Sequence, residues 1–223
     1  MRIDEILVQE GPNDPAIFKA IFTAGGPGSG KTFVVKHSAL EAMGFKIVNS
    51  DTQFERYLAQ ANMDSDPETI MSPQGQELRD RAKRVTKSAQ GGYMQGRLGL
   101  VIDGTGKDYD KIEKQVHLLS MLGYETAMLF VNTNLETAKS RNDKRKRSLP
   151  DTIVERMWND VQDNIGKFQR LFKQNMIIID NSDGNDVSVD LNASYKQISA
   201  WASSPPSTPQ AKKWLAANKG KNK

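Results

Sequence analysis

The 223-residue sequence contains no cysteine, only two histidines (His37 and His117) and no long apolar run. Without cysteine the chain forms no disulfide bond or thiolate metal site, and two imidazoles leave little for a histidine-rich metal centre. No segment approaches the roughly 18 apolar residues of a membrane span, and no basic region precedes an apolar one at the N-terminus. We therefore expect a cytoplasmic protein without a membrane segment. Any metal should be a hard ion on oxygen ligands, and both histidines should be structural or on the surface.

The net charge of +4 is unevenly distributed along the chain. The segment Lys139–Arg147 has six basic residues and one acid, and the last thirteen residues have five lysines and no acid, which leaves the rest of the chain at −6. Positive charge gathered in one internal segment and one tail is typical of a local phosphate site. It is not the pattern of a surface that binds nucleic acid throughout.

Apolar runs and helical periods alternate along most of the chain, which indicates an α/β protein with a parallel sheet covered on both faces. Five runs are short, apolar and mostly bounded by Gly, Asn or Asp, as buried strands are. The expected strands are 16–24, 45–49, 98–103, 125–131 and 176–180.

Three helices are expected between these strands. Residues 112–122 have apolar side chains at helical spacing, and Gly123 is a suitable C-terminal stop. A second helix is expected over residues 150–172, with Ser148 near its start as a cap, and a third over residues 75–95.

One domain is expected over residues 1–202, with a loop at 61–73. The segment 203–209 has three prolines and cannot continue a helix or a central strand. We expect the Lys-rich remainder to be a disordered tail, the alternative being that Trp214 and Leu215 dock on a partner or on nucleic acid.

Residues 25–32, Gly-Gly-Pro-Gly-Ser-Gly-Lys-Thr, match the pattern G-x-x-x-x-G-K-[ST] between an expected strand and an expected helix. The glycines let consecutive backbone N–H groups point at phosphate oxygens, and the helix N-terminus adds the positive end of its dipole. Lys31 is expected to reach the β- and γ-phosphates of ATP or GTP, and the Thr32 hydroxyl to bind Mg²⁺. A glycine-rich turn that binds nothing is the alternative, but it would have no use for Lys-Thr at its end. The expected nucleotide-binding residues are Gly26, Gly28, Ser29, Gly30, Lys31, Thr32 and Arg141.

Two carboxylates follow expected strands and should therefore lie at the carboxyl edge of the sheet, where ligands gather. Asp51 comes twenty residues after Lys31 and is our candidate for the general base; its alternative role is to cap a helix that starts near Gln53. Asp103 ends the third strand before Gly-Thr-Gly. It is expected to hold Mg²⁺ through water or to orient the substrate, the alternative being an ordinary turn residue.

The basic segment Lys139–Arg147 follows the fourth strand and an expected capping box over residues 133–136. Arg141 and Arg145 are four residues apart and so share a helix face, from which they would stabilise charge on the triphosphate while the segment closes over it. The alternative is a solvated basic helix end. The turn at 181–185 is expected near the nucleotide base, with no residue singled out.

The phosphate loop, Asp51, Ile-Asp-Gly-Thr at 102–105 and Ser-Arg-Asn-Asp-Lys-Arg at 140–145 before Leu-Pro together resemble the P-loop kinases that include zeta toxins and the 5′-hydroxyl polynucleotide kinases of tailed phages. The resemblance covers roughly residues 17–180, and the Arg-Asn-x-Lys-Arg segment is its most specific part. It implies a sheet in the order 2-3-1-4-5 with a lid over the nucleotide. It also implies Asp51 as base, Lys31 on the transferred phosphate, Arg141 on the triphosphate and Arg145 on the transition state.

The sequence departs from the polynucleotide kinase pattern at Phe54, where those enzymes have an arginine that binds substrate phosphate. Arg56 is an alternative for this role, but its side chain would point in a different direction. Phe54 is closer to zeta toxins, whose members phosphorylate nucleotide sugars. Three functions stay open: a kinase of zeta-toxin type for a nucleotide-like or nucleotide-sugar acceptor, a nucleic-acid 5′-hydroxyl kinase, and a nucleotide-binding switch with slow ATPase activity. The sequence identifies no protein partner.

Overall fold

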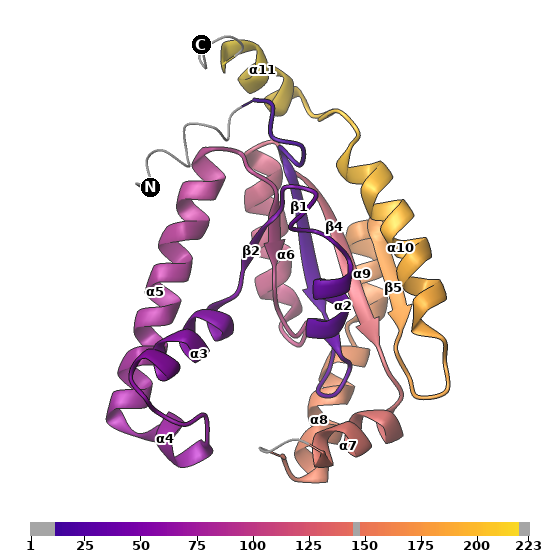
Figure 1. The fold of residues 1–223 in the computed structure, drawn as a ribbon. Coiled ribbons are helices and arrows are strands. Elements are labelled where there is room, and N and C mark those ends of the chain that lie inside the picture. The colour runs from indigo at the N-terminus through magenta and orange to yellow at the C-terminus, as the bar shows by residue number, and fades with distance from the viewer. Residues whose placement is uncertain (1–11, 145–147, 219–223) are drawn as a thin grey trace.

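The structure is a computed structural model that describes residues 12–144 and 148–218. Its centre is a five-stranded parallel sheet in the order β2-β3-β1-β4-β5 (Figure 1). The strands are β1 (Lys19–Ala24), β2 (Lys46–Val48), β3 (Leu100–Ile102), β4 (Glu125–Asn132) and β5 (Met176–Asp180). The expected fold class and strand order are therefore confirmed, and all five expected strands form, three of them shorter than expected.

Helices connect successive strands, as a parallel sheet requires. Those before β4 are α2 (Lys31–His37), α3 (Ser50–Gln60), α4 (Pro67–Met71), α5 (Pro73–Gln95) and α6 (Tyr109–Met121). Those after β4 are α7 (Leu135–Asp143), α8 (Asp151–Gln162), α9 (Ile165–Phe172), the 3₁₀ turn η1 (Lys173–Asn175), α10 (Val187–Ala202) and α11 (Pro209–Asn218). None of the helices in the described ranges has both the length and the apolar character needed to cross a membrane.

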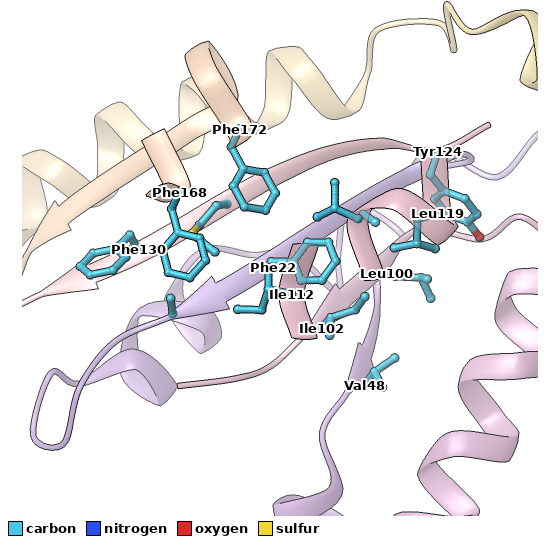
Figure 2. Close-up of a cluster of buried hydrophobic side chains, with 14 of the residues drawn as sticks. Phe22, Val48, Leu100, Ile102, Ile112, Leu119, Tyr124, Phe130, Phe168 and Phe172 are labelled. Atoms are coloured by element: carbon cyan, nitrogen blue, oxygen red, sulfur yellow. The ribbon is translucent and has the colours of Figure 1, made fainter. Parts of the chain in front are cut away.

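Helices pack on both faces of the sheet. On one face, Phe22 of β1 and Phe130 of β4 pack with Ile112 of α6 and with Phe168 and Phe172 of α9 (Figure 2). On the other face, side chains of α2 and α10 cover β1, β4 and β5; they include Val34, Leu191 and Ile198. The strands are apolar on both sides because each side meets a helix layer.

A helical lobe made of α3, α4 and α5 lies beside the edge strand β2 (Figure 1). It has its own small core, in which Phe54 and Leu58 of α3 pack with Ile70 of α4 and Ala82 of α5. The expected loop at 61–73 is therefore wrong in part, because Asp66 accepts a hydrogen bond from the Thr69 N–H and starts the short helix α4.

The single helix expected over 150–172 is two helices. The break between α8 and α9 falls at Asn164, whose buried side-chain amide donates to the carbonyls of Gly106, Lys107 and Asp160. These bonds attach the break to the loop after β3, which a periodic apolar stripe does not reveal. The expected cap is wrong as well, because Pro150 precedes α8 and no side chain caps that helix.

The expectation of a disordered tail is wrong for residues 209–218, which form α11. Its Ala211 is buried, and Trp214 meets Phe18 edge-on with ring centroids 5.5 Å apart. Residues 219–223 lie outside the described part of the chain. The prolines therefore mark the start of a docked helix, consistent with the tolerance of proline in a first helical turn.

The connection between α10 and α11 is held at the amino-terminal end of the sheet. Glu125 of β4 forms an ion pair of 2.5 Å with the fully buried Lys19 of β1, and it accepts the Ser207 N–H at 2.7 Å. Ser204 accepts a second hydrogen bond from Lys19 at 2.9 Å. Burial alone would raise the pKa of Glu125, but the hydrogen bonds from Lys19 and Ser207 outweigh it and hold that pKa below its ordinary value.

Candidate functional site

The phosphate-loop sequence lies between β1 and α2, at the end of the sheet to which the strands point (Figure 1). Gly28 and Gly30 have φ values of 70° and 76°, which residues with a side chain rarely adopt. A Cβ on Gly28 would lie 2.7 Å from the Ala138 carbonyl oxygen, and one on Gly30 would lie 2.3 Å from Nδ2 of Asn181. Both positions therefore require glycine on steric and conformational grounds.

Two polar side chains from other elements fix this loop. The amide of Asn181, directly after β5, donates to the Ser29 carbonyl at 2.7 Å. The guanidinium of Arg141 on α7 donates to the Gly28 carbonyl at 3.2 Å and pairs with Asp183 at 2.7 Å. The turn after β5, expected near the nucleotide base, thus contacts the phosphate loop, and Asn181 and Asp183 are the residues that sequence reasoning did not single out.

Asp103, at the end of β3, is the centre of a polar cluster. Its carboxylate pairs with Lys31 Nζ at 2.6 Å, and it accepts hydrogen bonds from the Thr23 hydroxyl at 2.5 Å and the Asn49 amide at 2.6 Å. The Lys31 and Asp103 side chains are only 16% and 13% exposed. The structure therefore pairs the expected phosphate-binding lysine directly with the expected third-strand acid. Thr23 of β1 and Asn49, the residue before α3, complete the cluster.

Asp51 lies in the first turn of α3 and is exposed. The cap of this helix is Asn49, whose side chain accepts the N–H groups of Asp51 at 2.7 Å and Thr52 at 3.3 Å. Asp51 is therefore not the helix cap. Its carboxylate makes no hydrogen bond or ion pair with any residue in the described ranges, so its oxygens remain accessible to a ligand.

The basic segment expected as a lid is partly described. Arg141 reaches the phosphate loop, whereas Arg145 lies in 145–147, outside the described residues. The buried side chain of Asn142 bonds both the N–H and the C=O of Leu149, which ties the end of α7 to the approach to α8. The expected capping box is wrong, because Asn134 caps α7 by accepting the Thr137 N–H at 2.7 Å.

Helix α8 also contacts the loop. A Cβ on Gly26 would come within 3.7 Å of Trp158, and the Trp158 indole donates to the Thr133 carbonyl at 2.8 Å. Helices α7 and α8 thus lie against the phosphate loop, and Trp158 is a further residue of the site that sequence reasoning did not single out.

A cavity of about 360 Å³ opens beside Asp103, between the sheet edge and helices α5 and α6. Its floor is formed by nearly buried apolar side chains, and Ser50 and Asp103 also line it, whereas Asp51 does not. The volume lies within the range of about 300–1,000 Å³ typical of small-molecule sites. The floor residues are Phe22, Val48, Ile102 and Ile112.

The residues present fit a nucleoside triphosphate with a hard metal ion. Gly28 and Gly30 form a narrow loop that no Cβ could enter, Lys31 and Arg141 supply positive charge, and Ser29 Oγ is buried without a hydrogen-bond partner among the described residues. No group of three or more His, Cys, Asp or Glu side chains that could hold a metal occurs in those residues. Mg²⁺ takes few protein ligands beside water and phosphate oxygens, and oxygen ligands are present here: Thr32 is exposed in the first turn of α2, and Asp103 follows β3 directly.

The strand order, the flanking helices and the phosphate loop define a single P-loop kinase-like domain. Residues 21–168 match a family model described as an AAA domain, and the chain belongs to this family. A search of curated proteins gave no match.

Several solved structures share the fold. A chain of the Pnkp1/Rnl/Hen1 RNA repair complex has a TM-score of 0.52 and 20% identity over 68% of this chain and 46% of that one. A chain of the complex AvrRxo1-ORF1:-ORF2 with ATP has a TM-score of 0.57 and 15% identity over 79% of this chain and 61% of that one. A chain of the PezAT toxin–antitoxin system of Streptococcus pneumoniae has a TM-score of 0.53 and 17% identity over 82% of this chain and 84% of that one. The present chain thus spans less than half of the first of these chains, and at such identities the likeness shows the fold alone.

Proposed function

We propose that this protein is a kinase that transfers the γ-phosphoryl group of ATP or GTP to a hydroxyl of a nucleotide-like or nucleotide-sugar acceptor. The ion pair between Lys31 and Asp103 carries the proposal. Lys31 belongs to the phosphate loop, and Asp103 lines the neighbouring cavity. A donor on the loop and an acceptor in the cavity would therefore meet at this pair.

The donor side follows from the chemistry of the loop. Backbone N–H groups and Lys31 would hold the β- and γ-phosphates, and Arg141, already at the Gly28 carbonyl, would bind the triphosphate. Arg145 is proposed to stabilise the transition state from the same segment. Bound Mg²⁺, held through Thr32 and water-mediated contact with Asp103, would neutralise phosphate charge.

The two carboxylates are suited to different roles. Asp103 already accepts hydrogen bonds from three side chains, so it is proposed to position Lys31 and the acceptor. Asp51 does not line the cavity itself but directly follows Ser50, which does, and its carboxylate has no partner among the described residues. We therefore propose Asp51 as the general base. It would take the proton of the acceptor hydroxyl while the new O–P bond forms and the bond from the γ-phosphorus to the bridging oxygen breaks, leaving ADP or GDP.

The test is transfer of γ-labelled phosphate from ATP or GTP, with Mg²⁺, to a panel of nucleosides, nucleotides, nucleotide sugars and 5′-hydroxyl oligonucleotides. Asp51→Asn should abolish transfer and leave ATP affinity nearly unchanged, because a base acts on the acceptor. Lys31→Ala should weaken binding and turnover together, whereas Lys36→Ala, an exposed lysine of the same helix, should change neither. Equal loss of affinity and transfer in Asp51→Asn would refute its role.

The other two functions make different predictions in the same assay. A 5′-hydroxyl polynucleotide kinase, the alternative that fits basic residues around the cavity, would label oligonucleotides and lose affinity for them steeply with salt. A nucleotide-binding switch would release free phosphate slowly, at a rate unchanged by Asp51→Asn, and would label no acceptor.

A further inference from the structure

Four lysines line the cavity beside Asp103, and we call them the lysine wall: Lys83, Lys87, Lys107 and Lys111. The first two are four residues apart on α5, so they occupy one face of that helix. The other two come from the loop after β3 and the first turn of α6. Two separate segments of the chain thus direct positive charge to the same cavity.

The two acids that line the cavity offset only part of the charge of this wall, because four lysines face two carboxylates. Asp103 is engaged with Lys31 of the phosphate loop, and Asp108 caps α6 by accepting the Lys111 backbone N–H at 3.0 Å. Lys83 has an exposed partner, Asp80, at 3.4 Å, and such surface pairs contribute little. Within residues 12–144 and 148–218, the other three lysines of the wall form no ion pair.

Like charges brought together around one hollow repel one another unless an anion lies between them. A cleft lined by one sign of charge also concentrates ligands of the opposite sign. The cavity has an apolar floor below this charged rim, and Thr86 and Gln90 of α5 add hydrogen-bonding groups to its lining. This combination suits a molecule with an uncharged ring or sugar body and a compact anionic group.

We infer that the lysine wall binds a phosphate group that the acceptor already carries, an inference that rests on the proposed function. The acceptor hydroxyl reacts near Asp103, while its own phosphate is held by Lys87, Lys107 and Lys111. The wall thereby selects phosphorylated acceptors over nucleosides and neutral sugars. Lys87 and Lys111 are the specificity-determining residues, one from each helix.

The phosphate can belong to a mononucleotide-sized molecule or to a nucleic-acid strand, and the phosphate chemistry is common to both. In the strand case further phosphates would lie outside the cavity, so binding would fall steeply with salt. In the small-molecule case only the cavity contacts contribute, and the salt dependence is shallow. The salt dependence of binding, measured for a small phosphorylated ligand and for an oligonucleotide, therefore distinguishes the two origins of the phosphate.

The experiment is calorimetric titration of the full chain saturated with a non-hydrolysable ATP analogue and Mg²⁺, so that the phosphate loop is filled. The titrants are thymidine 3′-monophosphate and a 5′-hydroxyl oligothymidylate, each between about 50 and about 200 mM salt, with thymidine as the uncharged reference. The double variant Lys87→Ala/Lys111→Ala is compared with Arg84→Ala/Lys114→Ala, which removes two exposed cations of the same helices that do not line the cavity.

We expect thymidine 3′-monophosphate to bind at least about tenfold more weakly to the wall variant and within about twofold of normal to the control variant, and thymidine affinity to be equal in all three proteins. Equal losses in both variants, or no preference for the phosphorylated ligand, would overturn the inference. Binding of the ATP analogue is measured first, since its failure refutes the proposed kinase. If the analogue binds normally, and the protein transfers phosphate to uncharged acceptors equally well in wild type and in the wall variant, the role of the lysine wall is refuted while the proposed kinase stands.

Discussion

The substitution Gly30→Ala tests the phosphate loop as it is built in this chain. Gly30 has a φ of 76°, and a Cβ at this position would lie 2.3 Å from Nδ2 of Asn181. That amide cannot move away freely, because it donates to the Ser29 carbonyl at 2.7 Å and is buried. Alanine must therefore adopt an unfavourable backbone conformation and displace a hydrogen-bonded side chain.

Both effects have known sizes. The left-handed conformation costs a non-glycine residue about 1–2 kcal/mol. Displacing Asn181 removes a buried hydrogen bond and leaves the Ser29 carbonyl unsatisfied, which costs about 1–3 kcal/mol. We expect the free energy of unfolding to fall by about 2–5 kcal/mol and the Tm by about 4–20 °C.

Urea-induced unfolding of the nucleotide-free protein measures this loss, and two glycines serve as controls. Gly184 has a φ of 93°, and a Cβ at this position would meet no atom within 4 Å, so Gly184→Ala should show the conformational cost alone. Gly92 lies in α5 with similar free space, and Gly92→Ala should stabilise the protein by about 0.5–1 kcal/mol. If Gly30→Ala costs no more than Gly184→Ala, the Asn181 contact is refuted.

Three further predictions concern other contacts. The folded-state pKa of Glu125 lies below its ordinary value of 4.5, so its contribution to the free energy of unfolding should be fully present above that value and lost as the pH falls through the lower folded-state pKa. Free energies of unfolding from urea titrations of wild type and Glu125→Gln should therefore converge in acid. A difference that stays constant with pH would contradict the assignment. Trp214→Ala should lower the free energy of unfolding by about 2 kcal/mol through lost aromatic packing, against no change for the exposed Lys213→Ala. Asp183→Asn should release Arg141 and raise the KM for ATP by roughly threefold with little change in kcat, and an unchanged KM would show that the pair does not orient the arginine.

The sequence was most informative where local chemistry decides the structure. The five buried strands are short apolar runs, and the phosphate loop combines glycines with Lys-Thr between a strand and a helix. Gly123 ended the helix over 112–122 as expected, with a φ of 94° at that glycine. In each case a short stretch of consecutive residues is enough for the prediction, so no information about distant residues is needed.

Long-range hydrogen bonds were not visible in the same way. Asn164 breaks the expected long helix because its amide reaches the loop after β3, more than fifty residues earlier. Asn181 fixes the phosphate loop from the far end of the chain. Nothing in the residues around either asparagine identifies these partners, and an Asn in a turn is ordinary.

Composition misled the prediction of the tail. Lysines and prolines suggested disorder, yet Ala211, Trp214 and Leu215 follow at spacings of three and four and so lie on one helix face, with Thr208 accepting the Ala211 N–H at 3.2 Å. That face packs against the apolar cluster around Phe18. Periodicity was the better guide in this segment because a few apolar residues at helical spacing are enough to dock a short helix.

The cluster around Asp103 shows why its position could be predicted from the sequence while its partners could not. A strand-end acid is expected at the carboxyl edge of any parallel sheet, but Thr23 and Asn49 come from neighbouring strands whose order is known only from the fold. These two bonds do not involve Lys31. In the proposed kinase Lys31 would turn toward a phosphate while Thr23 and Asn49 still oriented Asp103, so the acid would keep its place at the cavity while the lysine changed partner.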